Sequence, residues 1–191
     1  MITSTPCIIF AGGKSSRMGA DKALLPFSSF KTLTEFQYHR LKKIFQNVYI
    51  SCKTRDKFDF EADFIEDSVQ TDVFAPTAGF IAAFSALQTE KIFVLSVDTP
   101  FINADIIKKI LEADTENSDA VVAKTEEGMQ PLCGLYHASL VDSFEQMQAN
   151  NNHKLGYLLK NSRTTFVFFE AHEAFLNLNH PHEYKKALTL V

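Results

Sequence analysis

The chain has 191 residues, a formal net charge of −4, 46% hydrophobic residues and 22% charged residues. This composition excludes a mainly disordered chain, and the length suits one domain with a sizeable core. No run of lysine or arginine provides the basic surface that nucleic-acid binding needs, so any basic site must be local.

The N-terminus is short and polar, without the pattern of a signal peptide, and no apolar run approaches the length of a membrane span. We therefore expect a cytoplasmic protein with neither a membrane nor a nucleic acid as partner. The three cysteines, Cys7, Cys52 and Cys133, lie far apart and form no C-x-x-C pair. Reduced, buried thiols are the expected state.

Strand-like and helix-like segments alternate along the chain. The expected strands are residues 7–10, 48–52, 63–67, 91–97, 119–123, 132–136 and 164–170. The expected helices are residues 34–45, 78–87, 103–113, 140–149, 156–160 and 181–188. Such alternation predicts parallel pairing with helices on both faces. We expect an α/β fold, a single-domain Rossmann-like three-layer sandwich with a mostly parallel sheet.

The first expected strand stops at Gly12 and Gly13, and the cations Lys14, Arg17 and Lys22 follow. Glycines let the backbone approach a ligand closely, and exposed N–H groups flanked by cations form a cradle for a polyphosphate. The alternative is an ordinary glycine-rich loop with a solvated basic rim. The segment matches neither the P-loop nor the dinucleotide-binding fingerprint.

Polar residues also fall where other expected strands end. In a parallel sheet, ligands bind beyond the carboxyl ends of the strands, which is where Ser51, Asp67 and Asp98 occur. A carboxylate at the mouth of a buried strand needs a cationic partner, and Mg²⁺ fits because it takes one or two carboxylates together with phosphate oxygens. Alternatively, Asp98 is a turn residue before Pro100, and Asp67 a solvated loop acid.

Residues 10–25 read F-A-G-G-K-S-S-R-M-G-A-D-K-A-L-L. This segment resembles the signature L-A-G-G-x-S-x-R-M-G-x-D-K-x-L-L of the molybdenum-cofactor nucleotidyltransferases (MobA-like), and Phe10 is its one departure. Residues 98–100, D-T-P, match the family's D-x-P metal element. Residues 75–79, A-P-T-A-G, resemble its G-P-x-A-G loop with Ala75 in place of glycine, and residues 177–181, N-L-N-H-P, resemble its closing N-x-N-x-P element.

The resemblance implies a sheet of the nucleotide-diphospho-sugar transferase type and one domain over residues 1–191, with a nucleotide-binding N-terminal part and an acceptor-binding C-terminal part. It implies transfer of GMP from GTP to the molybdopterin cofactor with release of pyrophosphate, and Mg²⁺ held by Asp98. Proteins that deliver or receive the cofactor are further expected partners. The implied catalytic residues are Arg17, Lys22 and Asp98, and the implied binding residues are Phe10, Ala11, Gly12, Gly13, Lys22, Ser51, Asp67, Gly79, Asp98, Asn177 and Asn179.

Three alternatives stay open. Ser51 stands where guanylyl-transferring members place an asparagine, so transfer of CMP to the same cofactor, or of another nucleotide to a sugar phosphate, remains a candidate activity. A binding module without turnover is the alternative from another class. Asn177 and Asn179 can offer amides to a ligand or end a strand and cap a helix. His180 and His182 lack a third ligand at metal-site spacing and are interpreted as surface residues.

Overall fold

The computed structural model describes residues 3–13, 19–67, 76–170 and 173–191. Its strands are β1 (Cys7–Phe10), β2 (Val48–Cys52), β3 (Asp63–Glu66), β4 (Lys91–Ser96), β5 (Ala120–Thr125), β6 (Gly128–His137) and β7 (Thr164–Phe168). Its α-helices are α1 (Leu33–Leu41), α2 (Pro76–Leu87), α3 (Ala104–Glu112), α4 (Val141–Ala149), α5 (Leu155–Lys160) and α6 (Pro181–Leu188). Short 3₁₀ turns cover Lys22–Leu24, Arg55–Lys57, Ala138–Leu140 and Glu173–Phe175.

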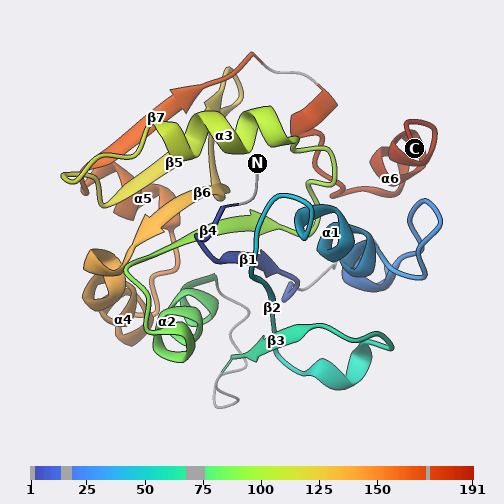
Figure 1. Cartoon of the computed structure of the whole chain (residues 1–191), viewed down its shortest axis with the longest axis horizontal. Coiled ribbons are helices and arrows are strands. Elements are labelled where there is room, and N and C mark those ends of the chain that lie inside the picture. Colours follow the sequence, from blue (N-terminus) through green and yellow to red (C-terminus); the bar gives the residue numbers. More distant parts are fainter. Residues whose placement is uncertain (1–2, 14–18, 68–75, 171–172) are drawn as a thin grey trace.

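The strands form one seven-stranded sheet in the order β3-β2-β1-β4-β6-β5-β7 (Figure 1). Strand β1 lies near its centre and pairs in parallel with β2 and β4. All four residues of β1 are buried because successive side chains enter opposite core layers. Cys7 and Ile9 join one layer, whereas Ile8 and Phe10 join the other. An apolar run without polar alternation therefore marks a strand covered on both faces.

Helices cover both faces of the sheet, which confirms the expected three-layer α/β architecture. One core layer includes residues of α1, α3 and α6, and the other includes residues of α2, α4 and α5. Phenylalanine fills much of this space: the rings of Phe80 in α2 and Phe144 in α4 stack with centroids 4.4 Å apart. The three cysteines are buried and free, as expected. No helix within the described residues is long and apolar enough to cross a membrane.

Strand β6 departs from the expected pattern of parallel pairing. It runs from Gly128 rather than residue 132, and it is antiparallel to both β4 and β5. Only Glu126 and Glu127 separate it from β5, and Gly128 has a φ of +130°. A connection this short can close a hairpin but cannot carry the chain back for a parallel crossover. The turn therefore lies at the carboxyl ends of the parallel strands, and β6 begins there.

Gly134 in β6 packs closely against the backbone of β5. A Cβ at this position would lie 2.6 Å from the backbone oxygen of Val121, close to the shift in register between Val122 and Ala123. Gly134→Ala should lower the free energy of unfolding by about 1–3 kcal/mol, because backbone atoms must move to admit the methyl group. Urea denaturation measures this change.

Gly156→Ala in helix α5 is the matched control. Its added Cβ would meet the flexible Met129 Sδ at 3.3 Å, and alanine is favoured over glycine inside a helix. This variant should stay within about 1 kcal/mol of the original protein. Equal stability of the Gly134→Ala protein and the original protein would contradict the packing argument.

Candidate active site

The ammonium group of Lys22 joins three distant segments of the chain. Its Nζ lies 2.6 Å from Asp98 Oδ2 and 3.0 Å from Asn179 Oδ1. Lys22 opens a 3₁₀ turn after the glycine-rich loop, Asp98 follows β4, and Asn179 precedes α6. The side chains of Lys22 and Asp98 are only 15% and 16% exposed. A cation and a carboxylate thus meet in a partly desolvated place, where their interaction with ligands is stronger than in water.

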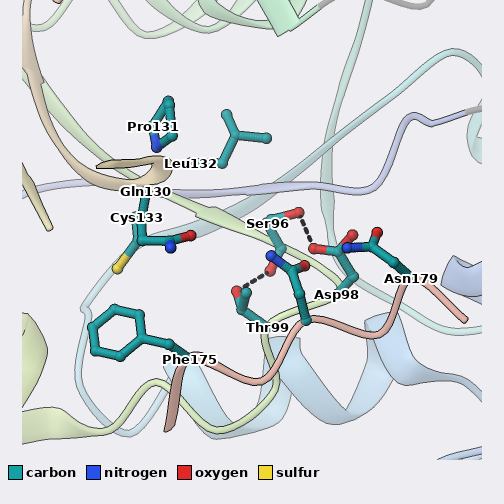
Figure 2. Close-up of a pocket in the computed structure, with 10 residues that line it drawn as sticks. Ser96, Asp98, Thr99, Gln130, Pro131, Leu132, Cys133, Phe175 and Asn179 are labelled. Atoms are coloured by element: carbon teal, nitrogen blue, oxygen red, sulfur yellow. Dashed lines mark hydrogen bonds between the residues drawn. The ribbon is translucent and has the colours of Figure 1, made fainter. Parts of the chain in front are cut away.

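The loop after β4 orients the carboxylate of Asp98. Ser96 Oγ donates a hydrogen bond of 2.5 Å to Asp98 Oδ1, and the N–H of Leu178 donates one of 2.9 Å to the carbonyl of Asp98. Figure 2 shows the Ser96–Asp98 hydrogen bond and the amide of Asn179 beside the Asp98 carboxylate. An ionised carboxylate has about four lone-pair positions, so the two bonds from Lys22 and Ser96 leave acceptor capacity for a further ligand.

A second cluster forms where β1 and β2 end against α2. A Cβ on Gly79 would lie 2.2 Å from Phe10 Cε1 and 2.8 Å from Ser51 Oγ, so this contact requires glycine. Ser51 Oγ in turn donates to Asp67 Oδ1 at 3.2 Å. Burial raises the pKa of Asp67 above its usual value, although the bond from Ser51 and the charge of Lys53 act in the opposite direction.

Backbone hydrogen bonds connect this cluster with Asp98. The N–H of Ala11 donates to the carbonyl of Ser51 at 2.9 Å, and the N–H of Val97 donates to the carbonyl of Phe10 at 3.1 Å. Gly12 and Gly13 follow with exposed backbone. Two sequence-predicted positions, Lys14 and Arg17, lie outside the described residues, as does Ala75.

Lys57 fixes both ends of the glycine-rich loop. Its Nζ lies 2.8 Å from Asp21 Oδ2 and 3.3 Å from the carbonyl oxygen of Ala11. The role of Lys57 is not predicted from the sequence, because nothing in the polar loop after β2 indicates which chain segment its side chain reaches.

A cavity of about 220 Å³ opens beside Asp98, between β6 and the segment before α6 (Figure 2). It is lined by Ser96, Asp98, Thr99, Gln130, Pro131, Leu132, Cys133, Phe175, Asn177 and Asn179. A second cavity of about 530 Å³ is also lined by Gln130, Phe175, Asn177 and Asn179, so the two cavities are neighbours at these residues. Gln130 reaches both cavities because β6 begins at Gly128 and runs antiparallel to β4.

The segment before α6 is held by Glu183. Its Oε2 accepts hydrogen bonds of 2.7 Å from the N–H groups of both Asn179 and His180. Asn179 therefore faces Lys22 from a fixed backbone, and Asn177 lines the cavity. The rings of His180 and His182 stack with centroids 5.5 Å apart.

The donor set near Asp98 suits a hard cation that is shared with a ligand. Within the described residues, no group of three or more His, Cys, Asp and Glu side chains converges on one point. A cage built by the protein alone is therefore absent from that part of the chain. One carboxylate with amide and hydroxyl oxygens nearby fits Mg²⁺, which completes its coordination with phosphate oxygens and water.

A glycine-ended central strand, a cation from the following loop and an acid after β4 together define a nucleotide-binding α/β protein. Residues 7–165 match the model of the MobA-like NTP transferase domain. The chain belongs to this family.

Two groups of relatives cover almost the whole chain. A protein of Campylobacter jejuni named molybdenum cofactor guanylyltransferase is 41% identical over 94% of this chain and 93% of its own length. A protein of Helicobacter pylori with the same name is 34% identical over 100% of this chain and 95% of its own length.

Solved structures share the fold. A protein of Aquifex aeolicus is 30% identical, with a TM-score of 0.75 over 92% of this chain and 93% of that chain. Molybdopterin-guanine dinucleotide biosynthesis protein A from Archaeoglobus fulgidus has a TM-score of 0.81 and covers 97% of this chain and 98% of that chain. At 20% identity, the second likeness concerns the fold alone.

Asp67→Asn should raise stability at neutral pH. Because the folded state raises the pKa of Asp67, the unfolded chain releases this proton first as the pH increases, and stability falls between the unfolded and folded pKa values. The neutral amide removes this loss, so its urea midpoint at pH 7 should exceed that of the original protein. Below about pH 3, where the carboxyl of the unfolded chain is also mostly protonated, the difference should disappear.

Asp59→Asn serves as the control, because the Asp59 side chain is 98% exposed. Its urea midpoint should be nearly the same as that of the original protein at both pH values. If Asp67→Asn lowers the midpoint at pH 7, the carboxylate is stabilised in the folded protein and the argument from burial is wrong.

Proposed function

We propose that this protein is a molybdenum cofactor guanylyltransferase, which transfers GMP from GTP to the phosphate of molybdopterin and releases pyrophosphate. The observation that carries the proposal is the contact of Lys22 with both Asp98 and Asn179. It brings the glycine-rich loop, an acid suited to a metal and the amide-lined cavity to one point. The names of the Campylobacter and Helicobacter relatives supply the base and the acceptor.

The reaction is a displacement at the α-phosphorus of GTP. The acceptor phosphate attacks in line, a new P–O bond forms, and the bond to the β-phosphate oxygen breaks so that pyrophosphate leaves. Such a transfer needs positioning and charge stabilisation, and no covalent enzyme intermediate is required. Lys22 and Arg17 would offset negative charge on the phosphates. Mg²⁺ held by Asp98 would neutralise charge on the phosphate oxygens.

The nucleotide-binding part of the proposal rests on the cluster around β1 and β2. Exposed N–H groups at Gly12 and Gly13 suit a phosphate, and the close packing of Phe10, Ser51 and Gly79 provides a wall for the nucleoside. Ala11 and Asp67, which both hydrogen-bond to Ser51, would complete this wall. Asp67 has a raised pKa in a partly buried place, which is a frequent property of ligand-binding carboxyls.

The acceptor would occupy the two neighbouring cavities near Asp98. Asn177 and Asn179 present amide groups, which both donate and accept hydrogen bonds, as a pterin ring or its phosphate requires. Gln130 adds a third amide, and Phe175 adds an apolar surface. Within one domain, residues of the first half would thus bind GTP and residues of the second half would bind the acceptor.

Asp98→Asn should abolish most Mg²⁺-dependent turnover. The amide keeps the size of the side chain and can still accept from Ser96, but it removes the charge that attracts the cation. We expect pyrophosphate release to fall by on the order of 10²–10³, the typical effect of losing one charge-stabilising group. Thermal unfolding should show a folded protein. An unchanged Mg²⁺ titration of activity would exclude Asp98 as the metal ligand.

Competition between nucleotides tests the base. With equal GTP and CTP, molybdopterin and Mg²⁺, the product should carry guanine, as mass spectrometry can determine. Guanine needs donors and acceptors together, and backbone groups of residues 11–13 with Ser51 can supply both. Ser51 in place of the family asparagine keeps cytidylyl transfer as the second candidate. An excess of the cytosine product would overturn the assignment of the base and leave nucleotidyl transfer intact.

A further inference from the structure

A buried amide of α1 contacts the loop that carries Asp98. Gln37 has no exposed surface, and its Nε2 lies 3.1 Å from the carbonyl oxygen of Thr99, 3.3 Å from that of Val97 and 3.4 Å from that of Ser96. These carbonyls belong to the end of β4 and the loop that follows it. One side chain therefore provides donors to the backbone on both sides of Asp98.

Arg40, one helical turn further along α1, fixes the orientation of this amide. Its Nε and Nη2 donate to Gln37 Oε1 at 3.1 Å and 2.5 Å, and its Nη1 donates to the carbonyl of Ile102. Burial lowers the pKa of Arg40 to about 10, which leaves it charged at neutral pH. Because the guanidinium only donates, Gln37 must turn its oxygen toward Arg40 and its NH₂ group toward the loop.

The same loop is anchored on its other sides by backbone hydrogen bonds. Val97 donates to the carbonyl of Phe10, and Leu178 donates to the carbonyl of Asp98. The hydrogen bonds from Gln37 in α1 hold the same loop from a third element. If the Gln37 amide were removed, carbonyl groups in a buried place would lose their donors, and the loop would rearrange to satisfy them.

We propose that Gln37, oriented by Arg40, is a positioning residue that sets the place of the Asp98 carboxylate for metal-dependent nucleotidyl transfer. The proposal rests on the proposed function and concerns the geometry of the same site. Partners of this kind hold a metal-binding carboxylate in place without touching the metal, and their loss typically lowers metal affinity or activity about 10–100-fold.

Loss of the Gln37 amide should impair the use of Mg²⁺ and leave the binding of GTP nearly unchanged. Among the described residues, the side chain of Gln37 bonds to the loop carbonyls and to Arg40, and not to the nucleotide-side cluster of Phe10, Ser51 and Gly79. Gln37→Met, which keeps the length of the side chain and removes its polar atoms, should therefore lower kcat and raise the Mg²⁺ concentration for half-maximal rate, each about 10–100-fold. The KM for GTP should change by less than about threefold, because uniform binding is retained.

Further variants isolate the donor. Gln37→Glu still accepts from Arg40 but presents oxygen instead of NH₂ to the loop carbonyls, so it should be impaired at least as much as Gln37→Met at pH 8. Arg40→Lys cannot donate to both Gln37 and Ile102 from a planar group, and it carries the test if Gln37→Met does not fold. The control is Ser118→Ala, which removes a buried hydroxyl 2.8 Å from Thr115 Oγ1. Ser118 precedes the first residue of β5, whereas Asp98 follows the last residue of β4.

Two readouts do not require turnover. Amide hydrogen exchange of residues 97–102 should be faster in Gln37→Met than in the original protein and the Ser118→Ala control. Electron paramagnetic resonance should show weaker Mn²⁺ binding in the presence of GTP. Unchanged exchange, Mn²⁺ affinity and Mg²⁺ dependence in folded Gln37→Met would overturn the proposal. If the original protein releases no pyrophosphate, the proposed function fails, while exchange and Mn²⁺ binding still decide the role of Gln37.

Discussion

The ion pair between Lys22 and Asp98 is the contact on which the arrangement of the site depends. It joins residues 76 positions apart in the chain, and the bond from Lys22 to Asn179 spans 157 positions. Removing two charges from water is costly, and their attraction offsets that cost only when the geometry and the surrounding hydrogen bonds are good. Ser96 supplies one such bond to Asp98, so the pair is part of a small network rather than an isolated contact.

Hydrogen bonds from several parts of the chain hold the loop that carries Asp98. The loop after β4 accepts hydrogen bonds from α1 and from the segment before α6, and it donates one to β1. Glu183 holds the segment before α6 through two backbone N–H groups. A nucleoside triphosphate with a divalent cation carries both signs of charge. In the proposed reaction, this ligand would compensate the charges of Lys22 and Asp98 separately, provided that the backbone keeps both side chains in place.

The features predicted from the sequence are those that depend on local pattern. The apolar run of β1 and the glycines after it mark a buried strand and a loop, and the position of Asp98 at the end of β4 follows from the topology of parallel sheets. The helix expected over residues 34–45 ends at Leu41, because tight turns then bring Phe45 into a bridge with Thr3. Neither the reach of Lys57 nor the contacts of Gln37 has a local signal, since both depend on segments brought together by folding.

Because β6 runs antiparallel to β5, a hairpin lines one side of the larger cavity. The hairpin of β6 with β5 places Thr125, Glu127 and Gln130 along the larger cavity, whereas the residues proposed to bind the nucleotide come from β1, β2 and the loop after β4. Surface hairpins tolerate changes in length and composition better than buried parallel strands do. Substitutions in this turn can therefore reshape the larger cavity without changing the glycine-rich loop. The cavity and the glycine-rich loop are thus able to evolve separately.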